Sequence, residues 1–144
     1  MQSPNYFILY VDSPAKSAAF YQELLGRAPV ESSPTFAMFA LDAGVMLGLW
    51  SRHTVEPAAR VAGGGHEVAF AVQGKAAVDG CFAAWTARGL TVAQAPVDLD
   101  FGYTFVVLDP DQHRLRVFAP AGDYRRSTPR RQTGGGLLRQ GPSR

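Results

Sequence analysis

The feature that most constrains the fold is an internal repeat. Residues 5–11 form an aromatic and β-branched run that is typical of a buried strand, and residues 66–72 form a similar run 61 positions later. Residues 36–42 match residues 103–109 at a spacing of 67, and both segments end in Asp followed by a turn. The 144-residue chain is therefore expected to fold as two related modules.

Each module is expected to have the order βαβββ. Ser13 and Pro14 are typical of the cap and first residue of a helix that ends at Gly26, and the second helix has an apolar stripe from Val78 to Trp85. The remaining expected strands are residues 28–32, 36–42 and 45–50 in the first module and residues 91–97, 103–109 and 113–118 in the second. This pattern predicts an α+β fold in which two tandem βαβββ modules form a curved mixed sheet with a concave ligand cup.

Composition divides the chain further. We assign residues 1–50 to the first module, 51–65 to a Gly- and Pro-containing linker, 66–122 to the second module and 123–144 to a disordered basic tail. Residues 1–123 carry 8 Lys and Arg against 12 Asp and Glu, whereas the last 21 residues carry six Arg and no acid. The tail is interpreted as a solvated extension, with contact to nucleic acid or another acidic partner as the alternative.

Several protein classes are excluded or disfavoured. The longest apolar runs are far shorter than the roughly 18 residues of a membrane span, and the first residues do not resemble a signal peptide, so we expect a cytoplasmic protein with no membrane partner. The single cysteine, Cys81, rules out an internal disulfide and lies on the apolar stripe of its helix, where a buried structural thiol is expected. His53 is expected to be exposed in the linker, and His113 to belong to a turn.

Strand alternation assigns residues to two faces of each expected sheet. Phe7, Leu9 and Val11 in the first strand, with their counterparts Val68, Phe70 and Val72, are expected beneath the helices. The intervening residues are expected to face the cup: Tyr6, Ile8, Tyr10, Glu67, Ala69 and Ala71.

The chain resembles the vicinal oxygen chelate superfamily, which includes glyoxalases, bleomycin-resistance proteins and extradiol dioxygenases. The matching residues are Tyr10–Ser13 with Ser17–Gly26, and Phe101–Phe105 with Leu108–His113. The resemblance covers about residues 4–120 and implies the two-module fold and a homodimer. In metal-dependent members, His, Gln or Glu ligands occupy positions that correspond to Tyr6, Gly48, Glu67 and Arg116. Of these four residues only Glu67 could bind a metal. Because of this departure from the metal-dependent members, we expect no metal and no cofactor.

We expect Glu67 and Arg116 to form an ion pair on the cavity floor; the alternative is that both are solvated rim charges. Aromatic and sulfur-containing side chains could line the same cup as stacking partners for a planar ligand, although an aromatic residue in a strand is more often part of a core. The candidate ligand-binding residues are Tyr6, Met38, Trp50, Glu67, Phe101 and Arg116, with Gly48 expected to open space beside Trp50.

The segments Leu49–Ser51 and Asp100–Gly102 resemble the branch of the superfamily that binds antibiotics without chemistry. This resemblance predicts a homodimer that sequesters a small aromatic antibiotic or metabolite without a metal and without catalytic residues. The alternative is an enzyme of the same fold, such as a lyase, dioxygenase or thiol transferase, with Glu67 as its base and with or without a metal. A third reading is an adaptor that acts through its basic tail; otherwise we expect no nucleic-acid partner.

Overall fold

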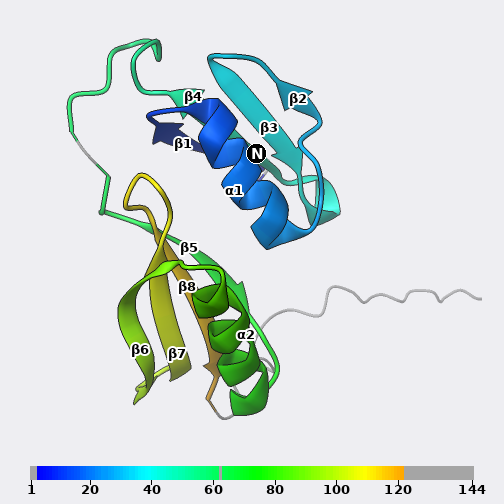
Figure 1. The fold of residues 1–144 in the computed structure, drawn as a ribbon, viewed down its shortest axis with the longest axis vertical. Coiled ribbons are helices and arrows are strands. Elements are labelled where there is room, and N and C mark those ends of the chain that lie inside the picture. The colour runs from blue at the N-terminus through cyan, green and yellow to red at the C-terminus, as the bar shows by residue number, and fades with distance from the viewer. Residues whose placement is uncertain (1–2, 62, 122–144) are drawn as a thin grey trace, which may run out of the picture.

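A computed structural model describes residues 3–61 and 63–121; the expected basic tail lies outside these residues. The first module contains β1 (Tyr6–Val11), α1 (Pro14–Leu25), β2 (Glu31–Ser32), β3 (Phe36–Ala40), a 3₁₀ turn (Asp42–Gly44) and β4 (Met46–Ser51). The second contains β5 (Glu67–Ala71), α2 (Lys75–Ala87), β6 (Thr91–Leu99), β7 (Gly102–Leu108) and β8 (Arg114–Pro120). The α+β fold of two tandem βαβββ modules is confirmed. Figure 1 shows the two modules, each with its helix against one face of its own sheet.

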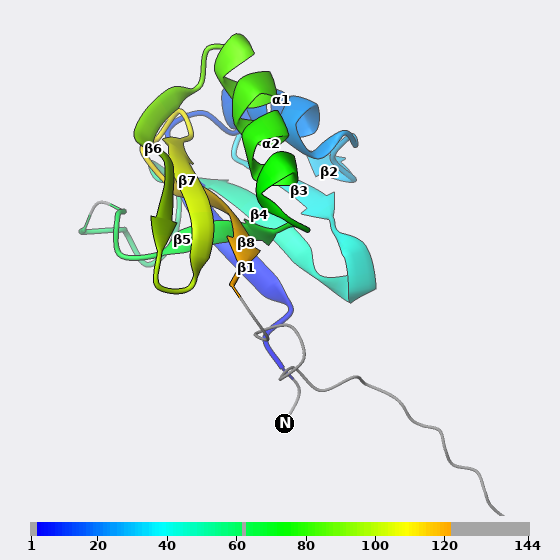
Figure 2. The same cartoon turned by 90° about the horizontal axis from the view of Figure 1, so that it is seen from below.

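The two sheets have the same topology. Their strand orders are β1-β4-β3-β2 and β5-β8-β7-β6, so each first strand pairs in parallel with the last strand of its module and forms an edge. The remaining neighbours are antiparallel. The sheets are not joined into one closed sheet, and Figure 2 shows them from a second direction with both helices.

The first helix begins and ends where capping chemistry predicts. The Ser13 hydroxyl accepts a hydrogen bond from the Lys16 amide at 3.2 Å, and Pro14 occupies the first turn of α1. Gly26 ends this helix in a left-handed conformation, with φ of +70°. Neither helix has the length and apolar character needed to cross a lipid bilayer.

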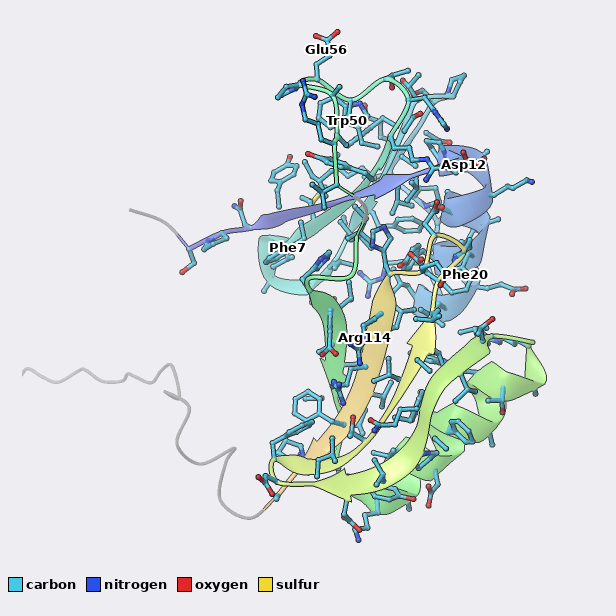
Figure 3. The ribbon with its side chains drawn as sticks, turned by 90° about the vertical axis from the view of Figure 1, so that its left-hand side faces the viewer. Phe7, Asp12, Phe20, Trp50, Glu56 and Arg114 are labelled. Atoms are coloured by element: carbon cyan, nitrogen blue, oxygen red, sulfur yellow. The ribbon has the colours of Figure 1, made fainter. Side chains whose placement is uncertain are left out.

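Strand alternation separates buried from exposed residues on β1, with one exception. Leu9 and Val11 are 2% and 0% exposed beneath α1, whereas Tyr6 and Tyr10 on the opposite face are 54% and 44% exposed. Phe7 was expected beneath the helix but is 52% exposed. It lies near the beginning of β1, and its side chain lines a cavity between the modules (Figure 3).

The two modules are connected through a buried carboxylate. Asp109, which follows β7, is 4% exposed. Its Oδ1 accepts hydrogen bonds from the amides of Asp111 and His113 at 2.8 and 2.9 Å, which fixes the turn into β8. Its Oδ2 accepts the hydroxyl of Tyr21 from α1 at 2.7 Å. Burial, followed by the charge of Asp109, raises the pKa of Tyr21, so the phenol stays protonated and remains the donor.

Neighbouring residues of the same turn extend this connection. Asp111 Oδ1 accepts the Asp12 amide at 2.9 Å, and its Oδ2 accepts the Ser17 hydroxyl at 3.3 Å. His113 Nε2 lies 3.0 Å from the Tyr10 carbonyl oxygen. The expectation that His113 is simply a turn residue was therefore incomplete: it is 6% exposed and joins the second module to the end of β1.

Replacing Tyr21 with Phe tests this connection. Tyr21→Phe leaves the buried carboxylate without one donor, so we expect the free energy of unfolding to fall by about 1–3 kcal/mol in urea denaturation. Tyr103→Phe is the matched control, because the Tyr103 hydroxyl binds Asp79 on the surface; little change is expected. Equal effects of the two substitutions would contradict the role assigned to Asp109.

Candidate functional site

The candidate site is built around an ion pair on the open face of the second sheet. Arg116 Nε and Nη2 donate to the two oxygens of Glu67 at 2.8 and 2.9 Å, so the pair is bidentate. The side chains of Arg116 and Glu67 are 14% and 29% exposed. The expected ion pair is present, with Arg116 the less exposed of the two side chains.

Further contacts hold the Arg116 guanidinium in place. Its Nη1 donates to the hydroxyl oxygen of Thr104 at 3.1 Å, and that hydroxyl donates to the Val117 carbonyl at 2.8 Å. Thr104 is fully buried, so this arm of the guanidinium is anchored in the sheet. Arg116 also lies 5.4 Å from the centroid of the Phe101 ring, within the range of a cation–π interaction.

The electrostatics of the site favour an ionised Glu67. Its hydrogen bonds with Arg116 lower the pKa of Glu67 and outweigh desolvation, which acts in the opposite direction. Arg114 contributes from the same face of β8, with Nε 3.6 Å from Glu67 Oε2. Glu67 therefore has two cationic neighbours and is a weaker base than a free carboxylate.

Phe101 forms an aromatic wall beside this ion pair. It precedes β7, is 42% exposed and meets Phe118 edge-to-face at a centroid distance of 5.7 Å. Gly102 makes this turn possible: its φ is +152°, and a Cβ there would collide with the backbone carbonyl oxygen of Ala119. A cavity of about 360 Å³ is lined by Glu67, Ala69, Phe101, Arg116 and Phe118.

The other three candidate residues lie on the first module. Tyr6 pairs with Met46 in the register of β1 and β4, while Met38 pairs with Gly48 in the register of β3 and β4. Trp50 is partly exposed at the end of this face (Figure 3) and meets the Phe36 ring at 6.1 Å. Thus the structure brings Glu67, Phe101 and Arg116 together but does not place Tyr6, Met38 or Trp50 in their cavity.

The space expected beside Gly48 is occupied. A Cβ at Gly48 would lie 3.0 Å from Cζ of Phe36 and 3.4 Å from Cγ1 of Ile8. The missing side chain lets the Phe36 ring lie against the sheet and does not leave an open pocket. This expectation was wrong because the register alone does not reveal which aromatic ring crosses from β3.

A second, apolar cavity of about 460 Å³ lies between the edge strands of the two modules. Phe7, Ile8 and Leu9 contribute from β1, and residues 66–70 contribute from the other side. Glu67 lines both this cavity and the 360 Å³ cavity, so the ion pair stands where the two spaces approach each other. A planar molecule stacked on Phe101 would contact the ion pair on one side and lie close to the apolar cavity.

The donor set does not fit a metal ion. Glu67 is the one carboxylate at the four positions identified by sequence resemblance, and both of its oxygens are bound by Arg116. A permanent guanidinium stands where a second ligand would be required. Across residues 3–61 and 63–121, no group of three or more His, Cys, Asp and Glu side chains has the geometry to hold a metal.

Comparison with known proteins establishes the family. A family model described as the glyoxalase/bleomycin resistance protein/dioxygenase superfamily matches residues 3–117. The chain therefore belongs to this superfamily, in which a common fold supports several activities.

Individual relatives give a more specific context. The chain is 57% identical to protein ATC0852 from Agrobacterium tumefaciens, whose solution NMR structure aligns over 85% of this chain and 100% of that chain with a TM-score of 0.75. It is 29% identical over 118 residues to the phenazine antibiotic resistance protein EhpR of Enterobacter agglomerans, covering 80% of this chain and 90% of that protein. A glyoxalase-related enzyme from Fulvimarina pelagi shares the fold, with 22% identity, coverage of 83% and 88%, and a TM-score of 0.73.

Two residues of the site were not predicted from the sequence. Phe118 and Arg114 flank Arg116 at two-residue spacing on β8 and share its face. The period of two in a strand contained the signal for both residues. Applying it to residues 113–118 as a whole would have placed an aromatic and a second cation beside the ion pair.

The lowered pKa of Glu67 gives a pH-dependent prediction. A carboxylate whose pKa falls on folding stabilises the protein above its ordinary value of 4.5, and this stabilisation is lost as the pH falls through the lower, folded value. The stability difference between wild type and Glu67→Gln should therefore be largest near neutral pH and shrink below about pH 4.5. Thermal unfolding of both proteins from pH 3 to 7 measures this stability difference.

Glu31→Gln is the control for this comparison, because Glu31 is exposed on the short strand β2. It should lack the same pH-dependent loss. A difference between wild type and Glu67→Gln that stays constant down to pH 3 would show that the ion pair does not stabilise the ionised carboxylate.

Proposed function

We propose that this protein binds and sequesters a small planar aromatic antibiotic or metabolite without using a metal ion. The bidentate Glu67–Arg116 pair beneath the exposed ring of Phe101 is the observation that carries this proposal. In this pair the Glu67 carboxylate and the Arg116 guanidinium are bound to each other, while the exposed ring of Phe101 can stack on a ligand. Such aromatic contacts are worth about 0.5–1.5 kcal/mol beyond area burial.

One relative supports the same class of ligand. EhpR is named as a phenazine antibiotic resistance protein, and phenazines are planar, fused aromatic molecules. The 360 Å³ cavity is within the size range of small-molecule pockets, and its lining combines two aromatic rings with a few polar groups. Phenazine is therefore the first compound to test.

The alternative is an enzyme of the same superfamily that uses Glu67 as a base. The hydrogen bonds from Arg116 lower the pKa of Glu67, which reduces its tendency to take up a proton. A binding role uses the observed pair as it stands, whereas base catalysis would require Glu67 to leave Arg116. The arrangement therefore favours binding.

We also propose a homodimer in which the open face of the first module covers the candidate site of a second copy. Tyr6, Ile8 and Tyr10 are 54%, 41% and 44% exposed along one face of β1. Contiguous apolar side chains of this kind mark interaction surfaces. This arrangement would add Tyr6, Met38 and Trp50 to a cavity that already contains Glu67, Phe101 and Arg116.

Tryptophan fluorescence tests the ligand proposal. Of the two tryptophans, Trp50 is partly exposed on the first module and Trp85 is 8% exposed beside Phe105. In the proposed dimer, Trp50 of one copy lies over the Phe101 cavity of the other. Phenazine should therefore quench the wild-type emission saturably, and Trp50→Phe should lose most of that response. Phe101→Ala should weaken binding by about tenfold while leaving the fold intact.

The controls separate binding from chemistry. Trp85→Phe should retain the quenching that reports on Trp50, provided that circular dichroism shows a folded protein. Native mass spectrometry with added Ni²⁺, Zn²⁺, Mn²⁺ or Fe²⁺ should show no stoichiometric metal retention. Tight retention of one metal per chain, or consumption of the aromatic compound, would overturn the sequestration proposal.

Ile8→Asp tests the dimer independently of the ligand. A charge in the exposed apolar row of β1 should shift the protein toward monomer in sedimentation velocity. Val61→Asp is the matched control, because Val61 is 85% exposed in the linker. If wild type is a monomer throughout the micromolar range, or both variants behave alike, this dimer is incorrect.

A further inference from the structure

A third cavity, separate from the aromatic site, brings together histidine and arginine side chains. Its volume is about 540 Å³, and it lies between the end of β1, the linker and the turn before β8. It shares no lining residue with the Glu67–Arg116 cavity. All three histidines of the sequence line it, together with two arginines: His53, His66, His113, Arg52 and Arg60.

The acidic groups around this cavity already have partners. Asp12 Oδ1 lies 2.7 Å from His53 Nε2 and 3.5 Å from Arg52 Nη2. Asp111, the one carboxylate in the lining, accepts the Asp12 amide and the Ser17 hydroxyl. The lining contains two arginines and one aspartate, and Arg52 also contacts Asp12 beside the cavity, which leaves Arg60 as the cation without a carboxylate partner among the described residues.

Arg60 is available to a ligand. It makes no hydrogen bond or ion pair with the residues described in the structure, and it lines the cavity from the linker. Arg52, by comparison, is held at 3.5 Å by Asp12, a weak contact between groups that are 56% and 60% exposed. Both guanidiniums can turn toward an anion at little cost in existing interactions.

The base of the cavity contains an unpartnered buried imidazole. His113 Nε2 must donate to the Tyr10 carbonyl, because that oxygen can only accept. Nδ1 is then left buried without a hydrogen-bond partner among the described residues, although His113 is 6% exposed. A buried polar atom in this state requires an explanation, and an unseen ligand is one of the accepted ones.

The backbone of Gly63 in the linker packs against the edge of this ring and buries Nδ1. A Cβ at Gly63 would lie 3.0 Å from Cε1 and 3.1 Å from Nδ1 of His113, so any larger residue would crowd that nitrogen. The His66 ring lies 6.0 Å from the His113 ring, centroid to centroid. Two arginines and two adjacent imidazoles thus surround one space.

We propose that this cavity binds a small oxyanion, either free or as the phosphate or sulfate group of a larger molecule. Arg60 and Arg52 provide charge and paired N–H donors. A neutral His113 whose Nε2 donates to Tyr10 can only accept at Nδ1, so this nitrogen donates to the anion when the His113 ring carries a second proton. The site is formed only when the two modules are together, because it draws on β1, the linker and the turn before β8. Anion binding would therefore reinforce the connection made by Asp109.

The test is an NMR titration of the full ¹⁵N-labelled chain with sodium sulfate. Ionic strength is held constant with sodium chloride, so that general screening does not change. Wild type should show saturable shifts for Gly63, His66 and His113. Arg60→Gln and Arg52→Gln should each weaken the affinity by about tenfold.

Two control variants keep the interpretation specific. Arg27→Gln removes an arginine that pairs with Asp42 on the first module and should leave sulfate affinity unchanged. Glu67→Gln should also retain it, which separates this site from the aromatic-ligand proposal. Linear, non-saturating shifts in wild type, or equal affinity in wild type, Arg60→Gln and Arg52→Gln, would overturn the oxyanion site. The same titration with inorganic phosphate and with a phosphate monoester shows whether the site binds the free ion or the phosphate group of a larger molecule more tightly.

Discussion

The buried carboxylate of Asp109 is the contact on which the rest of the structure depends. One of its oxygens fixes the turn into β8, and the other accepts the Tyr21 hydroxyl from the opposite module. The internal repeat is broken at this point. Phe82 occupies the position equivalent to Tyr21 and has no hydroxyl, while Asp42, equivalent to Asp109, has a 94% exposed side chain that pairs with Arg27. The contact therefore runs only from α1 of the first module to the turn before β8 of the second, and the repeat does not produce the equivalent contact in the other direction.

This connection also sets the geometry of the candidate site. The amide of His113 binds Asp109 immediately before β8 begins, so the turn fixes the start and the register of that strand. The register in turn places Arg116 opposite Ala69, on the face that carries Glu67. The residues that resemble the superfamily most strongly therefore maintain the fold. The chemistry of the candidate site comes instead from residues that differ from the superfamily's metal ligands, such as Arg116.

Much of the fold was predictable because it follows from local patterns. The repeat, the Ser13 cap and the alternation in β1 and β5 are short-range signals, and they located the elements. The Glu67–Arg116 pair was predicted from the resemblance, because these residues occupy metal-ligand positions of the superfamily. The errors arose where distant side chains determine the result. Phe36 covers Gly48, and His113 is buried by β1 and the linker. The sequence pattern of either strand alone does not show these contacts.

The central claim is that an aromatic ligand binds over an intact ion pair in place of a metal site. A crystal structure of the protein with phenazine is the most direct measurement. We predict that the ligand ring stacks on Phe101 while Arg116 Nε and Nη2 remain hydrogen-bonded to Glu67. A structure in which Glu67 turns away from Arg116 to bind a metal, or in which phenazine occupies a different cavity, would contradict this account.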